Sequence, residues 1–149
     1  MRLFLFLAAS AAACAVQPAP AAAEQAMGDV SRARWDRSTP AASIRGIIAA
    51  NKSGDRSWII ATFAPADRPG VAKLVSDPAM LAANSAIHKK IVSASVRNVR
   101  PYRGYAIVSV TEQLQGGKKR VVNYPLKRTP EGWLLSNDLA ADDNFQPYE

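Results

Sequence analysis

The sequence predicts an α+β protein in which N-terminal helices pack on one face of a curved antiparallel sheet of about four strands. Between residues 39 and 90, apolar side chains recur with the spacing of an amphipathic helix. From residue 91 onward they alternate with a period of two, which is typical of half-buried strands. Turns rich in Gly and Pro separate these later segments, and they indicate strands that follow one another in an antiparallel meander.

Helical segments are expected first. Thr39 can cap a helix with proline at its first position, and Gly54 can end it because glycine accepts the left-handed backbone. The apolar stripe of this helix consists of Ala41, Ile44, Ile47 and Ile48. Asp55 can cap a second segment, residues 56–64, for which a helix is favoured. A strand is the alternative, because residues 58–60 are aromatic and β-branched.

A third and a fourth helical segment complete the first half. After a connector of turn-forming residues at 64–70, residues 71–75 have the pattern of one or two helical turns. Asp77 then repeats the combination of a cap and an N-terminal proline. This combination predicts a helix from Pro78 to Lys90.

Four segments have strand periodicity, namely residues 91–96, 102–114, 120–127 and 132–136. Residues 115–118 form a hairpin signal with two glycines, and residues 129–132 form a second turn in which proline and glycine supply the required backbone angles. Pro125 lies inside the third segment and has no N–H to donate. The strand is therefore expected to be an edge or to bulge there.

The final strand, Glu131-Gly132-Trp133-Leu134-Leu135, and the order of helices before strands resemble the NTF2-like (cystatin-like) superfamily over roughly residues 39–139. The resemblance implies a bent sheet that closes a cone around an apolar interior. The superfamily includes isomerases, dehydratases, cyclases, subunits of secretion machines and plain binding modules. The resemblance therefore leaves the function open.

The N-terminus has the pattern of a secretory signal peptide. Arg2 precedes an apolar run that is too short to span a membrane, and small residues lead up to Glu24. Cleavage is expected after Ala23, which predicts a secreted or periplasmic protein, with residues 24–38 as a lead-in segment. Cys14 offers the alternative of a lipoprotein, which is disfavoured because the position three residues before it is alanine.

Charge is divided along the chain, which has 149 residues and a formal net charge of +7. Residues 89–128 contain ten basic residues and a single acid, whereas residues 129–149, which include an acidic tail at 140–149, have five acids and no base. A basic sheet region would attract an anionic envelope component or an acidic protein. Alternatively, it is a solvated surface that the tail neutralises. The residues expected to contact such a partner are Lys89, Lys90, Arg97, Arg100, Arg103, Lys118, Lys119 and Arg120.

Nucleic acid is a disfavoured partner, because export removes the opportunity and aromatic residues do not interleave with the basic ones. The single cysteine and single histidine exclude a disulfide framework, a multi-cysteine metal site and a two-histidine zinc motif. We therefore expect no metal and no cofactor.

No catalytic residue is assigned from the sequence. His88 lies among cations at a predicted helix end, where a surface position is expected. The acids that could partner an inward-facing tyrosine are expected to be caps or turn residues, namely Asp55, Asp67 and Asp77. Five aromatic residues could either line a cone pocket for a small apolar ligand or fill the core, and these are Trp58, Phe63, Tyr105, Tyr124 and Trp133.

Together these observations predict an exported binding or interaction module without catalysis. Two other classes remain open: an envelope enzyme of the isomerase or hydratase type that works inside the cone, and a subunit of a secretion or conjugation assembly. The sequence also leaves a homodimer open.

Overall fold

The computed structural model describes residues 35–149, so the expected leader at 1–23 and most of the lead-in segment lie outside the described residues. The helices come first, namely α2 (Pro40–Ser53), α3 (Arg56–Ala61), α4 (Arg68–Val75) and α5 (Pro78–Lys89). The strands follow, namely β1 (Ile91–Tyr102), β2 (Tyr105–Leu114), β3 (Lys119–Thr129) and β4 (Gly132–Leu135), and a short 3-10 turn, η2 (Asp138–Ala141), comes last.

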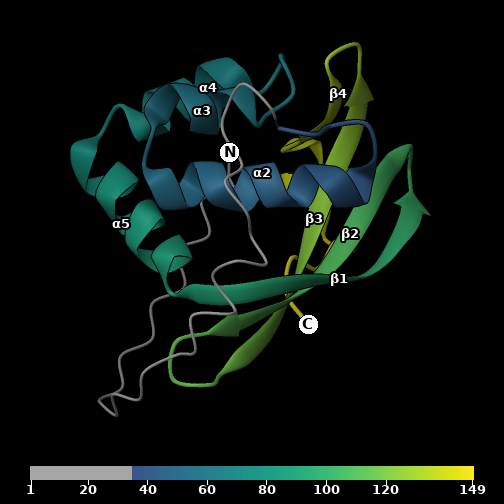
Figure 1. The fold of residues 1–149 in the computed structure, drawn as a ribbon. Coiled ribbons are helices and arrows are strands. Elements are labelled where there is room, and N and C mark those ends of the chain that lie inside the picture. The colour runs from purple at the N-terminus through teal and green to yellow at the C-terminus, as the bar shows by residue number, and fades with distance from the viewer. Residues whose placement is uncertain (1–34) are drawn as a thin grey trace.

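The four strands form one antiparallel sheet in the order β1-β2-β3-β4, and the helices lie on one side of it (Figure 1). The predicted α+β architecture, with helices on a four-stranded antiparallel sheet, is thus confirmed. Within residues 35–149 the structure contains no helix with the length and hydropathy of a membrane span.

The helix boundaries follow from local caps. The hydroxyl of Thr39 accepts a hydrogen bond from the Ala42 amide at 3.1 Å, and Gly54 ends α2 with a φ of 70°. Asp55 accepts from the Trp58 amide at 3.0 Å and begins α3, which is a helix as predicted but ends at Ala61. These side chains satisfy amide groups that have no partner inside the helix.

The first two strand boundaries differ from the prediction. Strand β1 continues to Tyr102, and a two-residue turn of Arg103 and Gly104, both with positive φ, connects it to β2. The predicted strand end at Val96 and restart at Tyr102 are therefore wrong. A register shift between Val96 and Asn98 inserts an extra residue, and this bulge interrupts the two-residue alternation.

Strand β3 lies between β2 and β4, so the prediction that Pro125 lies in an edge strand or at a bulge is wrong. The register between β2 and β3 is continuous through the pair Ile107–Pro125. The ladder with β4, however, stops at Leu126, and the Pro125 carbonyl accepts from the Ser136 amide at 3.0 Å beyond the end of β4. A missing N–H at this position therefore costs no bond of the β3–β4 ladder.

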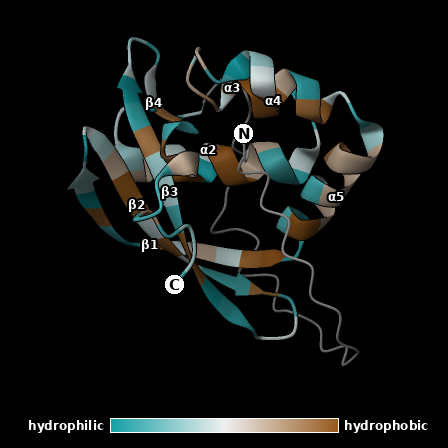
Figure 2. Cartoon of the chain, turned by 180° about the vertical axis from the view of Figure 1, so that it is seen from behind, coloured by the Kyte–Doolittle hydropathy of each residue, from teal (hydrophilic) through white to brown (hydrophobic). Residues whose placement is uncertain are grey.

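The central parts of β2 and β3 are buried on both faces, whereas most of β1 is exposed. On the helix side, Val108, Val110 and Tyr124 belong to the main core with the buried residues of α2. On the opposite face, Ile107 packs with Leu139 and Phe145 of the C-terminal segment. Figure 2 shows the contrast between these apolar regions and the hydrophilic β2–β3 hairpin.

The C-terminal segment returns to the sheet. The Asn123 amide donates to the Pro147 carbonyl at 2.9 Å, and Tyr148 forms an isolated antiparallel bridge with Val122. The acidic tail therefore lies along β3 beyond the end of β4.

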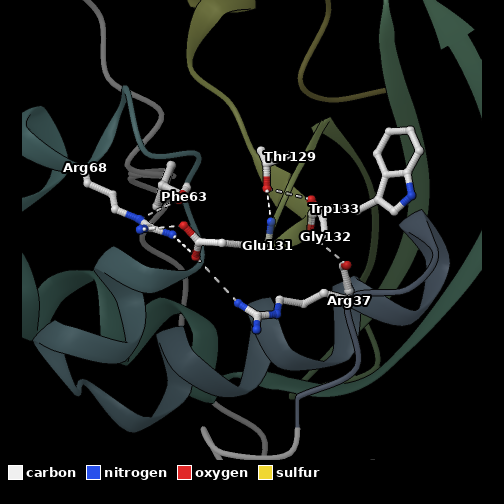
Figure 3. Close-up of polar contacts among 8 residues, drawn as sticks. Arg37, Phe63, Arg68, Thr129, Glu131, Gly132 and Trp133 are labelled. Atoms are coloured by element: carbon white, nitrogen blue, oxygen red, sulfur yellow. Dashed lines mark hydrogen bonds and ion pairs between the residues drawn. The ribbon is translucent and has the colours of Figure 1, made fainter.

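The β3–β4 turn is fixed to the segment before α2 and to α4 (Figure 3). Arg68 donates two hydrogen bonds to the carboxylate of Glu131, at 3.1 and 2.6 Å, and Arg37 lies 3.8 Å from the same carboxylate. These bonds with Arg68 hold the pKa of Glu131 below its usual value. The Trp133 amide donates to the Arg37 carbonyl at 3.0 Å, and Gly132 has a φ of 112°.

Candidate functional site

A buried polar cluster lies on the helix-facing side of the sheet. Glu112 of β2 has no exposed surface, and Tyr124 of β3 is 1% exposed. The Tyr124 hydroxyl donates to Oε1 of Glu112 at 2.6 Å, and Nε of Arg120 donates to Oε2 at 2.7 Å. Because Arg120 lies directly opposite Glu112 in the β2–β3 register, the ion pair is a cross-strand pair in the core. Each oxygen of Glu112 thus accepts a hydrogen bond from within the protein.

His88 of α5 faces the same cluster. It is 2% exposed, so the predicted surface position is wrong. Its Nδ1 atom lies 2.8 Å from the Asn84 carbonyl oxygen, which can only accept, and Nδ1 therefore carries the hydrogen. Burial lowers the pKa of His88 below its usual 6.5, and this effect outweighs the opposite influences of the Asn84 carbonyl and Glu112. The imidazole is therefore neutral near pH 7.

Tyr124 acts as a donor within this cluster. Burial, followed by the charge and hydrogen bond of Glu112, raises the pKa of Tyr124 well above its usual value. A phenol that stays protonated can donate a hydrogen bond and cannot serve as a base near pH 7. Glu112 and Arg120 thus form an ion pair, and Tyr124 donates to the carboxylate oxygen that Arg120 leaves free. The sequence interpretation missed Glu112 because it considered only the three acids outside the strands as partners for the tyrosines.

The five aromatic residues considered as pocket lining divide between two places. Trp58, Phe63 and Tyr124 belong to the helix-side core, and Trp133 packs against it. Tyr105 packs instead with Ile107 on the opposite face of the sheet. The structure therefore does not bring Tyr105 together with the other four, for which a pocket-lining role stays a prediction.

The three acids expected to be caps or turn residues all lie at helix starts or in turns, but only two of them cap a helix through the side chain. Asp55 and Asp77 accept bonds from helix amides, as expected. Asp67 makes no such bond to α4, and its carboxylate accepts from the amide of Asn137 at 3.3 Å. Burial is the main cause of a raised pKa at Asp67, and the charge of Asp138 adds to it. Asp67 thus joins α4 to the segment after β4.

Three of the eight basic residues expected to contact a partner are paired with carboxylates. Arg120 binds the buried Glu112 and its side chain is 19% exposed, so it is partly buried and its contact with a partner stays a prediction. Arg97 lies 3.1 Å from Glu149, and Arg103 lies 3.0 Å from Asp142. The tail therefore neutralises part of the sheet surface, which is the alternative that the charge pattern left open.

Four other basic residues gather at one end of the molecule. The Lys90 carbonyl accepts from the Gln115 amide at 2.8 Å, which places the end of α5 against the β2–β3 hairpin (Figure 1). We call the exposed lysines of these two segments the lysine cluster, and they are Lys89, Lys90, Lys118 and Lys119. Within residues 35–149, none of them forms an ion pair with a carboxylate. Arg100, the last of the eight, is exposed on β1 with its guanidinium 6.0 Å from the Tyr102 ring centre.

In the part of the chain that the structure describes, no group of three or more His, Asp or Glu side chains is arranged to hold a metal ion. No protein-family model matches the sequence, and a search of curated proteins finds no match. A crystal structure from Campylobacter jejuni, described provisionally as an NTF2-like transpeptidase, is similar in fold. It covers 65% of this chain and 97% of its own, with a TM-score of 0.48 and 13% sequence identity. At this TM-score and identity, the likeness carries no argument about family or activity.

Proposed function

We propose that the protein is an exported binding module whose lysine cluster contacts an anionic partner in the cell envelope. The observation that carries this proposal is the meeting of two segments, the end of α5 and the β2–β3 hairpin, at one end of the fold. Four exposed lysines lie on these two segments, and none of them pairs with a carboxylate among the described residues. Such a concentration of one charge attracts anions and speeds their association.

A binding role fits the buried cluster better than catalysis. Glu112 accepts from Arg120 and Tyr124, so its carboxylate is bound inside the protein. A general base needs a free acceptor that reaches the substrate. The cluster instead supports the fold beneath the β2–β3 hairpin, because Arg120 directly follows the hairpin residues Lys118 and Lys119.

The proposal also includes export. Residues 1–23 have the composition of a signal peptide, and the chain after them contains no cysteine. A protein without cysteine is indifferent to an oxidising compartment.

Charge reversal tests the lysine cluster. We expect Lys118→Glu/Lys119→Glu and Lys89→Glu/Lys90→Glu each to weaken binding to anionic probes by about tenfold or more, because each pair replaces two attractive charges with repulsive ones. The probes are polyglutamate and vesicles of equal parts phosphatidylglycerol and phosphatidylcholine. Affinity is measured by sedimentation for vesicles and by fluorescence anisotropy for polyglutamate.

The matched control is Arg45→Glu/Lys73→Glu, which makes the same change in net charge at two exposed positions on α2 and α4. It should change binding by less than about twofold, and binding of the wild-type protein should weaken as sodium chloride rises from about 0.05 M to about 0.3 M. Equal loss in the control, or affinity that does not depend on salt, would refute the proposed site. Circular dichroism confirms that each variant is folded.

A further inference from the structure

A shallow open groove of about 360 Å³ lies beside the lysine cluster. It runs along α5 between Pro78 and Lys89, past Leu81, Ala82, Ser85 and Ala86, and Gly54 of the loop after α2 flanks it beside Ser85. Lys89 thus belongs both to the groove and to the lysine cluster, so the two features are continuous.

The floor of the groove is apolar. Leu81, Ala82 and Ala86 offer no hydrogen-bonding side chain, and the hydroxyl of Ser85 donates to the Lys52 carbonyl at 3.0 Å. A groove with an apolar floor and one charged end fits a ligand that has an aliphatic group next to an anionic group.

We propose that this groove binds an aliphatic side chain of an acidic peptide segment in the partner protein, whose carboxylates lie over the lysine cluster. This inference rests on the proposed function and specifies the chemistry of the partner. The cluster spans two chain segments, α5 and the β2–β3 hairpin, so a run of several carboxylates matches it better than a single anionic head group.

The surface favours a peptide over a lipid bilayer. Proteins that bind a bilayer by an amphipathic surface insert their own large apolar side chains into it. Among the described residues, the exposed large apolar side chains are Val96, Val99 and Tyr148, which lie on β1 and in the tail. The lysine cluster adjoins the groove and not a protruding apolar side chain. The partner therefore has to supply the apolar group.

The groove also has a direction. The end of the groove at Pro78 adjoins the helix-capping carboxylate of Asp77, which repels an acidic ligand. The other end of the groove is Lys89. The aliphatic residue is therefore at one end of the acidic run rather than in its middle.

Labelled peptides test this inference. The probes are glutamate decamers that carry one leucine at either terminus, and matched decamers with alanine in its place. We expect the leucine peptide in the matching orientation to bind the full-length mature protein about tenfold more tightly than its alanine counterpart, because the groove removes leucine methylene groups from water. Fluorescence anisotropy measures both affinities.

A tryptophan in the groove is the decisive variant. Ala82→Trp fills the groove and should reduce the affinity for the leucine peptide to that for the alanine peptide. Ala79→Trp, at an exposed position of α5 outside the groove, should leave the leucine preference intact.

The outcomes separate the two proposals. If leucine and alanine peptides bind equally well while Lys118→Glu/Lys119→Glu weakens both, the groove inference is wrong and the proposed function stands. If neither peptide binds but anionic vesicles do, the partner is a membrane surface and the inference is again wrong. If reversal of the lysines changes neither peptide nor vesicle binding, the proposed function itself fails.

Discussion

The burial of Glu112 and His88 depends on residues that are distant in the sequence and close in the fold. Glu112 is the only acid among ten basic residues in its stretch of sequence, and nothing local distinguishes it from a surface residue. Its burial depends on Arg120 and Tyr124, which reach it only when β2 and β3 pair. The burial of His88 could have been predicted from the sequence. His88 follows Asn84 by one helical turn, so the two side chains lie on the same face of α5, which is buried.

Burial of neutral His88 predicts a loss of stability in mild acid. Its pKa in the folded state lies below the usual 6.5, so the unfolded chain binds the proton first as the pH falls. The free energy of unfolding should therefore decrease from about pH 6.5 down to the folded-state pKa and be unaffected by this residue above pH 7. Urea unfolding between pH 7 and about pH 5 measures the change.

The control for this prediction is His88→Asn, which keeps an amide donor for the Asn84 carbonyl and cannot titrate. Its stability should vary less over the same pH range. Other charged groups near His88, namely Glu112, Arg120 and Lys52, are unchanged in the variant. An identical pH dependence in wild type and variant would show that His88 does not control this loss.

At the scale of elements, helices were easier to predict than strands for a physical reason. The caps Thr39, Asp55 and Asp77 act within three residues of the amides they bind, so a short stretch of sequence contains the whole signal. The end of β1 has no such local signal. A bulge near Val96 breaks the alternation, and a turn that starts at Arg103 lacks the usual asparagine or aspartate.

The β3–β4 turn gives a prediction about glycine. A Cβ atom at Gly132 would lie 2.6 Å from both the Cβ and the carbonyl oxygen of Arg37, and φ is 112° (Figure 3). Gly132→Ala should therefore lower the free energy of unfolding by about 3 kcal/mol, through backbone strain together with displacement of Arg37. Urea denaturation measures this loss.

Gly117 in the β2–β3 hairpin is the matched position. It also has a positive φ, 79°, but a Cβ atom there would meet nothing within 4 Å. Gly117→Ala should cost only about 1 kcal/mol, because the backbone strain acts alone. Equal losses at the two glycines would mean that the contact with Arg37 contributes nothing.

At the scale of the whole molecule, the switch from helical to strand periodicity was enough to predict the α+β architecture. It was not enough to predict the distribution of charge. The sequence does not show that Lys90 contacts the β2–β3 hairpin, because the two are far apart along the chain. For the same reason it does not show which acids of the tail pair with Arg97 and Arg103. The basic stretch of the sequence is thus divided by folding into a lysine end and a partly neutralised arginine end.

The proposed export predicts a defined mature N-terminus. Expression of the full chain with its leader should yield a periplasmic protein that begins at Glu24, because signal peptidase cleaves after small residues such as Ala23. Intact-mass spectrometry of the secreted fraction measures the cleavage point. Cleavage immediately before Cys14, with an added lipid mass, would instead establish the lipoprotein alternative.

The outer side of β1 has a consequence for solubility. Fibre growth by strand addition needs a regular row of amide and carbonyl groups, and here Pro101 lacks an N–H while two register shifts disturb the spacing. The exposed guanidinium of Arg100 adds repulsion between identical copies, whereas that of Arg97 is paired with Glu149. Among residues 35–149, the outer edge of β1 is consequently a poor template for strand addition, even at high protein concentration.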